Sequence, residues 1–245
     1  MALHGFHGRY SGTRTLSAAS LLPLARLLQL ASPALPVGAY TYSQGLEWAV
    51  QCGTVSDEAS AGQWIGDFLE LGLGRFELPL LAAALTAWQT QDTTRLDALD
   101  ALFLASREAA ELRAETVQMG FSLRRLAREL GDPCLEPLLA WSAPRTEVSF
   151  PLLCAGFARA WALEEGAALA AYLWSWAENQ VIAALKAVPL GQAAGQRLLA
   201  GLGARIPQTV AAALALPPAS WCNTAPALAI ASCRHETQYS RLFRS

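Results

Sequence analysis

The sequence predicts an all-α, single-domain bundle of about ten helices. Three observations support this prediction: 53% of the 245 residues are hydrophobic, small residues and leucine outnumber β-branched ones, and no run alternates apolar and polar residues for long enough to form a strand. A chain of this length can bury one large core. Only 16% of the residues are charged, against ~25% in typical soluble domains, so we expect an apolar surface that needs protein partners.

Helices are expected wherever apolar side chains recur at positions i, i+3 and i+4. The segments with this spacing are, in order, 15–31, 43–52, a stretch through 64–73, 77–90, 93–105, 106–130, 134–142, 148–163, 165–188, 190–204, 207–215 and 224–233.

Proline, glycine and capping residues set the expected helix ends. Pro33 ends the first helix because proline lacks an amide donor, and Thr54 or Ser56 can cap the third. The two glycines within 71–74 predict the end of that third helix. Pro207 predicts a helix break near the start of the uncharged, apolar tract 206–233.

The chain divides into three expected regions. Residues 1–14 form a flexible extension, residues 15–233 form the helical domain, and residues 234–245 form a polar tail. The tail contains arginine and aromatic residues, which are enriched at binding hot spots. We therefore expect the tail to become ordered when a partner binds.

Charge and cysteine content exclude several classes of protein. A formal net charge of −2 gives no electrostatic attraction to nucleic acid or to anionic lipid. The single lysine, Lys186, is followed by alanine, so the chain has no Walker A loop for nucleotide binding. Five scattered cysteines and no export signal indicate free thiols in the cytoplasm. The sequence contains no unbroken apolar helix of about 20 residues, so we expect no membrane span.

The residues that could bind a metal or act in catalysis form no convincing site. His4 and His7 lie in the flexible extension and would make a weak, unselective metal site. Cys233 and His235 could both be metal ligands, but Cys233 ends an apolar stripe, so we favour a buried thiol. A Ser–His–Asp hydrolase would depend on His235, and no G-x-S-x-G motif accompanies it.

The carboxylates are too dispersed for a paired acid and base. Glu108, Glu111 and Glu115 are interleaved with Arg107 and Arg113, which predicts a solvated helix face. The sequence therefore predicts a protein that is not an enzyme, with no catalytic residue, no cofactor and no metal site.

Residues 27–50 form a polar interruption between two apolar runs. Pro33 and Pro36 stop a helix, Gly38 permits a turn, and residues 41–44 fit the S/T-x-x-Q capping box that starts a new helix. We expect this arrangement to present a recognition surface. Its residues are Tyr40, Tyr42, Ser43, Gln44 and Glu47.

A second polar patch surrounds the only lysine. Asn179 and Lys186 are seven residues apart, so on a helix they share a face about 10 Å apart. Gln192 lies in the small, polar start of the next helix. Two interpretations remain open, because Lys186 could extend from a core helix to reach solvent, or it could belong to a patch that binds a partner.

Three segments together resemble the UreF family of urease accessory proteins. These are LLQLASPALPVGAYTYSQGLEWAV (27–50), WSWAENQVIAALKAVPLGQ (174–192) and HETQYSRLFRS (235–245), and they occur in the family's order. The resemblance covers nearly the whole chain after about residue 15. One departure is Ala39, where many relatives have glycine or serine.

The resemblance implies a non-catalytic, homodimeric maturation factor. Such proteins join the UreD (or UreH) accessory protein and the UreG GTPase on urease apoprotein and help to deliver nickel to the urease active site. An alternative role is to activate or gate the GTPase, with Arg241 or Arg244 as an arginine finger. The residues that the resemblance implies in partner contact are Tyr40, Tyr42, Ser43, Gln44, Glu47, Lys186, Gln192, Arg241, Leu242, Phe243, Arg244 and Ser245.

Overall fold

A computed structural model describes residues 18–223 and 225–245, and over these residues it contains helices and no strands. The all-α fold class is thereby confirmed. The α-helices are α1 (Ala18–Ala31), α2 (Leu46–Gln51), α3 (Glu58–Asp67), α4 (Leu78–Thr90), α5 (Thr93–Ala105), α6 (Ala110–Leu130), α7 (Glu136–Ser142), α8 (Phe150–Ala160), α9 (Glu165–Ala187), α10 (Gln192–Ala215) and α11 (Pro226–His235).

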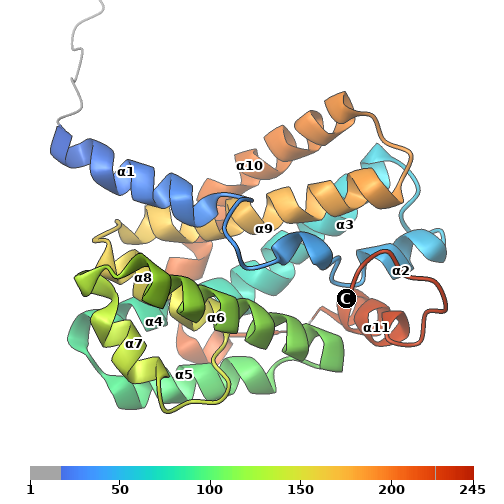
Figure 1. The fold of residues 1–245 in the computed structure, drawn as a ribbon. Helices are drawn as coiled ribbons and strands as arrows, with labels where there is room; N and C mark the ends of the chain where they lie inside the picture. The colour runs from blue at the N-terminus through green and yellow to red at the C-terminus, as the bar shows by residue number, and fades with distance from the viewer. Residues whose placement is uncertain (1–17, 224) are drawn as a thin grey trace, which may run out of the picture.

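The core is built on two pairs of helices. Helix α9 packs along α10, and α4 packs against α8 (Figure 1). Trp88 of α4 joins the second pair, because its indole nitrogen donates to the carbonyl oxygen of Leu152 at 3.0 Å and its ring meets Trp141 edge-on at 5.3 Å. Figure 1 also shows the end of the chain lying beside α2 and α11, on the opposite side of the molecule from α1.

The predicted break at residues 71–74 is wrong. Helix α3 continues through the π-helical segment η2 (Phe68–Glu77) into α4. The glycines serve close packing instead of ending the helix, because a Cβ atom on Gly74 would lie 2.7 Å from Thr209 of α10. The cap of α3 is also a correction: Asp57, and neither Thr54 nor Ser56, accepts the Ser60 amide at 2.8 Å.

The predicted break at Pro207 is wrong as well, because Pro207 lies inside the continuous helix α10. Pro207 is exposed, and its buried neighbours Ile206 and Val210 hold the helix on the core. As one helix, α10 is long and apolar enough to cross a membrane, judged by length and composition alone. Such a helix is weak grounds for a membrane span, and Arg197 and Arg205 of α10 pair with Glu58 and Glu70 of the bundle.

Candidate functional site

The three segments that carry the family resemblance meet in space. The C-terminal tail (236–245) lies against the segment 38–47 and the end of α9. Lys186 joins all three, because its Nζ atom lies 5.9 Å from the ring centroid of Tyr40 and 5.6 Å from that of Phe243. Seven residues, or about two turns, earlier on the same helix, Asn179 donates to the carbonyl oxygen of Tyr42 at 3.2 Å.

The predicted capping box at residues 41–44 does not form. A short 3-10 helix, η1 (Ala39–Thr41), follows Gly38, and Thr41 donates its hydroxyl back to the Gly38 carbonyl at 2.9 Å. Gln44 and Gly45 then adopt positive φ angles of 52° and 80°, so α2 begins only at Leu46. This left-handed turn directs the amides of Ser43 and Gln44 toward the tail.

Those amides hold Ser245. The Ser245 main-chain oxygen accepts from the Ser43 amide at 2.7 Å, from the Gln44 amide at 3.0 Å and from the Ser43 hydroxyl at 2.5 Å. The Ser245 hydroxyl donates to Glu115 of α6 at 2.8 Å. Ser245 is 1% exposed, so the end of the tail is part of the core.

The residues that hold the tail and support one another beneath it form a socket, which consists of Ser43, Gln44, Glu47, Glu111, Glu115 and His235. Glu115 of this socket contacts both Gln44 and Ser245. Gln44 donates to it at 2.7 Å, and the Gln44 side-chain oxygen in turn accepts from the Trp176 indole at 2.7 Å. Burial raises the pKa of Glu115 to about 7, although the hydrogen bonds from Gln44 and Ser245 act in the opposite direction. Glu115 therefore contradicts the prediction of a solvated face.

A second carboxylate holds the middle of the tail. Glu47 accepts from the amides of Leu242 at 2.7 Å and Phe243 at 3.0 Å, and it also contacts His235 at 3.2 Å. The other ring nitrogen of His235 lies 2.6 Å from Glu111. Both nitrogens thus face carboxylates, which leaves His235 unable to activate a serine.

Glu111, Glu115 and His235 are the socket residues that the sequence interpretation missed. Glu111 and Glu115 are four residues apart and so share one face of α6. That spacing was a signal for a common partner, but the partner became identifiable only once the tail was placed on α6.

The residues expected at the surface divide into two groups. Tyr42, Ser43 and Glu47 are buried, so the prediction that they form an exposed surface is wrong. Tyr40 is 60% exposed and Leu242 is 72% exposed, and Lys186 is also exposed. These three exposed side chains line an open groove together with three neighbours. The full lining is Tyr40, Thr41, Lys186, Leu242, Phe243 and Arg244.

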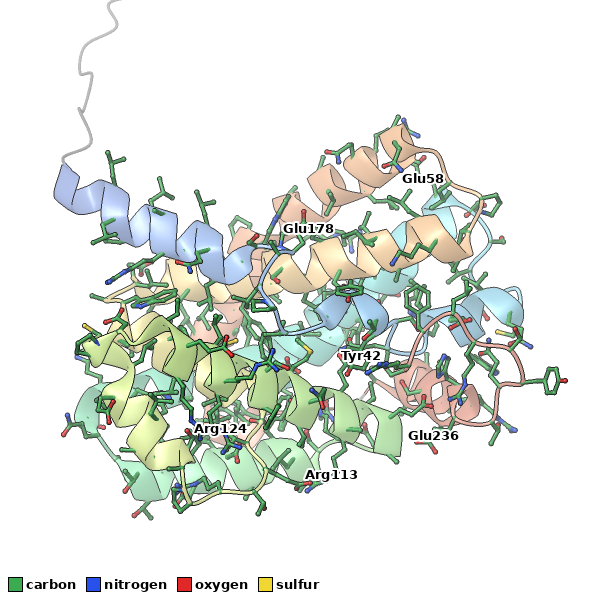
Figure 2. The ribbon with its side chains drawn as sticks, viewed as in Figure 1. Tyr42, Glu58, Arg113, Arg124, Glu178 and Glu236 are labelled. Carbon is green, nitrogen blue, oxygen red and sulfur yellow. The ribbon has the colours of Figure 1, made fainter. Side chains whose placement is uncertain are left out.

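Gln192 and Arg241 lie outside this groove. Gln192 is exposed at the start of α10. Arg241 pairs with Glu111 at 2.5 Å. Figure 2 shows the side chains on the ribbon, with Tyr42 and Glu236 labelled in the region of the tail.

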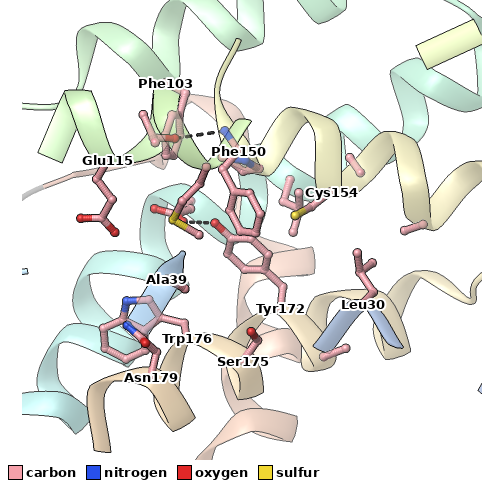
Figure 3. Close-up of a pocket in the computed structure, with 18 of the residues that line it drawn as sticks. Leu30, Ala39, Phe103, Glu115, Phe150, Cys154, Tyr172, Ser175, Trp176 and Asn179 are labelled. Atoms are coloured by element: carbon pink, nitrogen blue, oxygen red, sulfur yellow. Dashed lines mark hydrogen bonds between the residues drawn. The ribbon is translucent and has the colours of Figure 1, made fainter. Parts of the chain in front are cut away.

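An internal pocket lies below the socket, between α4, α6, α8 and α9 (Figure 3). Its walls are mostly apolar, and its polar groups pair with each other: Tyr172 donates to Glu77, which also pairs with Arg107 at 3.5 Å. Burial raises the pKa of Cys154 and of Tyr172 well above the usual values, and the charge of Glu77 adds to both shifts. A thiol held protonated in this way is a poor nucleophile.

Across residues 18–223 and 225–245, no group of three or more histidine, cysteine or acidic side chains is arranged to hold a metal ion. Cys233 is exposed, so the expectation of a buried thiol is wrong. His4 and His7 lie outside the described residues.

Comparison with known proteins supports the same family as the three sequence segments. A family model for UreF matches residues 55–203. A protein named urease accessory protein UreF from Dechloromonas aromatica is 63% identical over 224 residues, covering 91% of this chain and 98% of the relative. Another with that name, from Azoarcus sp. (strain BH72), is 60% identical over 234 residues, covering 94% of this chain and 99% of the relative. The chain belongs to the UreF family.

Proposed function

We propose that this protein is a non-catalytic maturation factor for urease. It binds a UreD/UreH accessory protein and the UreG GTPase on urease apoprotein, and it supports insertion of nickel into the urease active site. The names of its relatives support the link with urease. The observation that carries the binding role is the groove in which Tyr40, Lys186 and the tail come together.

The groove has the chemistry of a protein-binding surface. It presents an exposed aromatic ring, an ammonium group and a guanidinium group next to the apolar side chain of Leu242. Tyrosine and arginine are enriched at the energetic centres of interfaces. The buried residues Tyr42, Ser43, Gln44, Glu47 and Ser245 contribute indirectly, because they position the tail that forms one wall of the groove.

Further surfaces suit further partners. Helix α1 exposes a row of leucines, and this apolar face supports the homodimer that the family resemblance implies. Gln192 lies outside the groove, and we propose it as a separate contact with a partner protein. We place the complete assembly in the cytoplasm.

The test is co-purification with UreD/UreH and UreG from the same cell. We expect Lys186→Ala to weaken the complex roughly tenfold, about 1.4 kcal/mol, because it removes the charge at the centre of the groove. Arg128→Ala is the matched control, since Arg128 is an exposed cation at the far end of α6. If no complex forms with the unmodified protein, or if both variants weaken it equally, the proposal is wrong.

A second candidate function is regulation of the GTPase. The exposed side chain of Arg244 lines the groove and hydrogen-bonds the phenol of Tyr42, whereas Arg241 is ion-paired with the carboxylate of Glu111. The geometry therefore favours Arg244 as an arginine finger. Arg244→Ala should then lower stimulated GTP hydrolysis by about a thousandfold, and Arg241→Ala should not. This candidate fails if the protein leaves hydrolysis by nickel-loaded UreG unchanged or slows it.

A further inference from the structure

A second open groove lies on the other side of the molecule from the tail. It is bounded by the C-terminal ends of α4 and α8 and by parts of α5 and α7, and we call it the α4–α8 groove. Figure 1 shows α7 and α8 well away from α11 and the end of the chain. The volume of the α4–α8 groove is about 740 Å³, within the ~300–1,000 Å³ that is typical of binding pockets.

The floor of the α4–α8 groove is aromatic and held in place. The rings of Trp88 and Trp141 meet edge-on with 5.3 Å between their centroids, and the Trp141 indole donates to Asp97 at 2.9 Å. Both rings line the groove, although most of each ring is buried. Short side chains, including those of Pro137 and Ala140, form the rim beside them. A partner that covers this floor orders little that is not already fixed, so the cost of binding is low.

Two strained backbone positions shape the walls. Gln91, after α4, and Ala162, after α8, have φ angles of 54° and 53°, and both line the α4–α8 groove. Positive φ angles are uncommon for residues other than glycine, and such strain is often found at binding sites. Among residues 18–223 and 225–245, the one other residue of this kind is Gln44, which belongs to the socket of the tail.

The charge of the α4–α8 groove is positive. Of the side chains that line it, Arg159 alone is charged. Arg159 is exposed, and within the described part of the chain its guanidinium has no ion pair and no hydrogen bond. Asp92 and Glu136 adjoin the rim along the chain, but neither lines the groove, and Asp92 is engaged as the cap of α5.

The two carboxylates that support the groove from behind are already neutralised by arginines. Asp97, which accepts from the Trp141 indole, pairs with Arg145. Asp132 accepts the amide of Cys134 at 3.0 Å and pairs with Arg26 at 3.5 Å. The charge without a partner is therefore the guanidinium of Arg159, and a carboxylate is the group that complements it.

We propose that the α4–α8 groove binds a segment of a partner protein that combines large apolar side chains with a carboxylate. The apolar side chains cover Trp88 and Trp141, and the carboxylate pairs with Arg159. The exposed amide side chain of Gln91 can hydrogen-bond the backbone of the segment. The proposal rests on the proposed function only for the source of the segment, which is a component of the urease maturation complex. Because the two grooves lie apart, both can be occupied at once.

Alkylation of Cys134 reports whether the α4–α8 groove is occupied, because this exposed thiol lines it. Mass spectrometry gives the rate of reaction with iodoacetamide for each cysteine. The rate for Cys134 is compared between the isolated full-length protein and the protein co-purified with UreD/UreH, UreG and urease apoprotein. We expect Cys134 to react at least about tenfold more slowly in the complex. An equal rate in the two samples would overturn the proposal.

A charge reversal tests the role of Arg159. Arg159→Glu should restore most of the Cys134 reactivity in the complex, while the complex still forms through the groove at Lys186. Arg75→Glu is the matched control, because Arg75 is an exposed arginine of η2 that does not line the α4–α8 groove. Circular dichroism verifies that both variants fold. Protection that persists in Arg159→Glu, or that is lost in Arg75→Glu, contradicts the proposal.

Peptides test the chemistry of the segment on the isolated protein. The probes are DLFEELL and KLFKKLL, capped at both ends, which share their apolar residues and carry opposite charges. At millimolar concentration the acidic peptide should slow alkylation of Cys134 at least about twofold, and the basic peptide should not. Arg159→Glu should abolish the effect of the acidic peptide.

Absence of protection by the acidic peptide, or equal protection by both peptides, shows that the proposal is wrong. If no complex with UreD/UreH and UreG forms, the proposed function fails, and the peptides alone decide whether the α4–α8 groove binds such a segment. If the complex forms but Cys134 reacts freely in it, the α4–α8 groove is not a binding site and the proposed function stands.

Discussion

At the scale of single residues, Gly45 shows how one backbone position holds the site together. Its φ angle is 80°, and a Cβ atom there would lie 2.9 Å from the Cβ atom of Ala231 and 2.9 Å from the Ser232 nitrogen of α11. Gly53 has the same φ of 80° with open space around it. Gly53→Ala should therefore lower the free energy of unfolding by about 1 kcal/mol through backbone strain alone.

Gly45→Ala should lower it by about 2–4 kcal/mol, since the added methyl also collides with α11. Urea denaturation of the two variants measures the difference. Equal losses would show that the close approach of α2 and α11 contributes nothing.

Glu115 makes global stability depend on pH. Its folded pKa of about 7 is above the ordinary value of 4.5, so the stability present below pH 4.5 decreases as the pH rises toward 7. The loss is at most about 3 kcal/mol. Glu115→Gln cannot ionise, so its free energy of unfolding relative to the unmodified protein should increase from pH 5 to pH 8 in urea titrations. A constant difference over that range would contradict the assignment.

At the scale of helices, capping was only partly predictable: the cap of α3 is Asp57, one residue after the expected Ser56, and the cap of α6 comes from a distant segment. Asp92 caps α5 locally, because its carboxylate accepts the amide of Arg95, only three residues away, at 2.9 Å. The N-terminus of α6 has no side-chain cap from Ala109. Its cap is Glu236, which accepts the Ala110 amide at 2.7 Å from 126 residues further along the chain. A distant segment also explains why the capping box predicted at 41–44 does not form. The Ser43 and Gln44 amides, which lie where the helix was expected to begin, bind Ser245 instead.

The cap from Glu236 has a measurable effect on α6. Glu236→Ala should lower the free energy of unfolding by about 1 kcal/mol, because it leaves the Ala110 amide without its acceptor. Glu236→Gln keeps a side-chain oxygen and should lose less. Thermal unfolding followed by circular dichroism separates the two, and equal melting temperatures would mean that the cap is unimportant.

At the scale of the whole molecule, the fold class followed from composition and spacing, whereas the site depended on contacts between distant segments. The sequence identified the three segments that meet at Lys186. It did not indicate that Ser43 and Glu47 would face inward, because a polar side chain is read as exposed until its buried partner is known. The partners here are backbone amides and a main-chain oxygen of the tail, which no pattern of side chains reveals.

Deletion of residues 236–245 tests the relation between fold and site. The core helices end at His235, so the helical circular dichroism signal should persist, with a lower melting temperature because the α6 cap and the burial of Phe243 are lost. Pull-down with UreD/UreH should fail, since the tail forms a wall of the groove.

Tyr239→Ala is the control for a change in the tail that leaves the socket intact, because Tyr239 projects fully into solvent while Phe243 is buried. Phe243→Ala should reproduce most of the binding loss through a single side chain. Binding retained by the truncated protein would show that the groove acts without the tail, and loss of the helical signal would show that the tail belongs to the folding core.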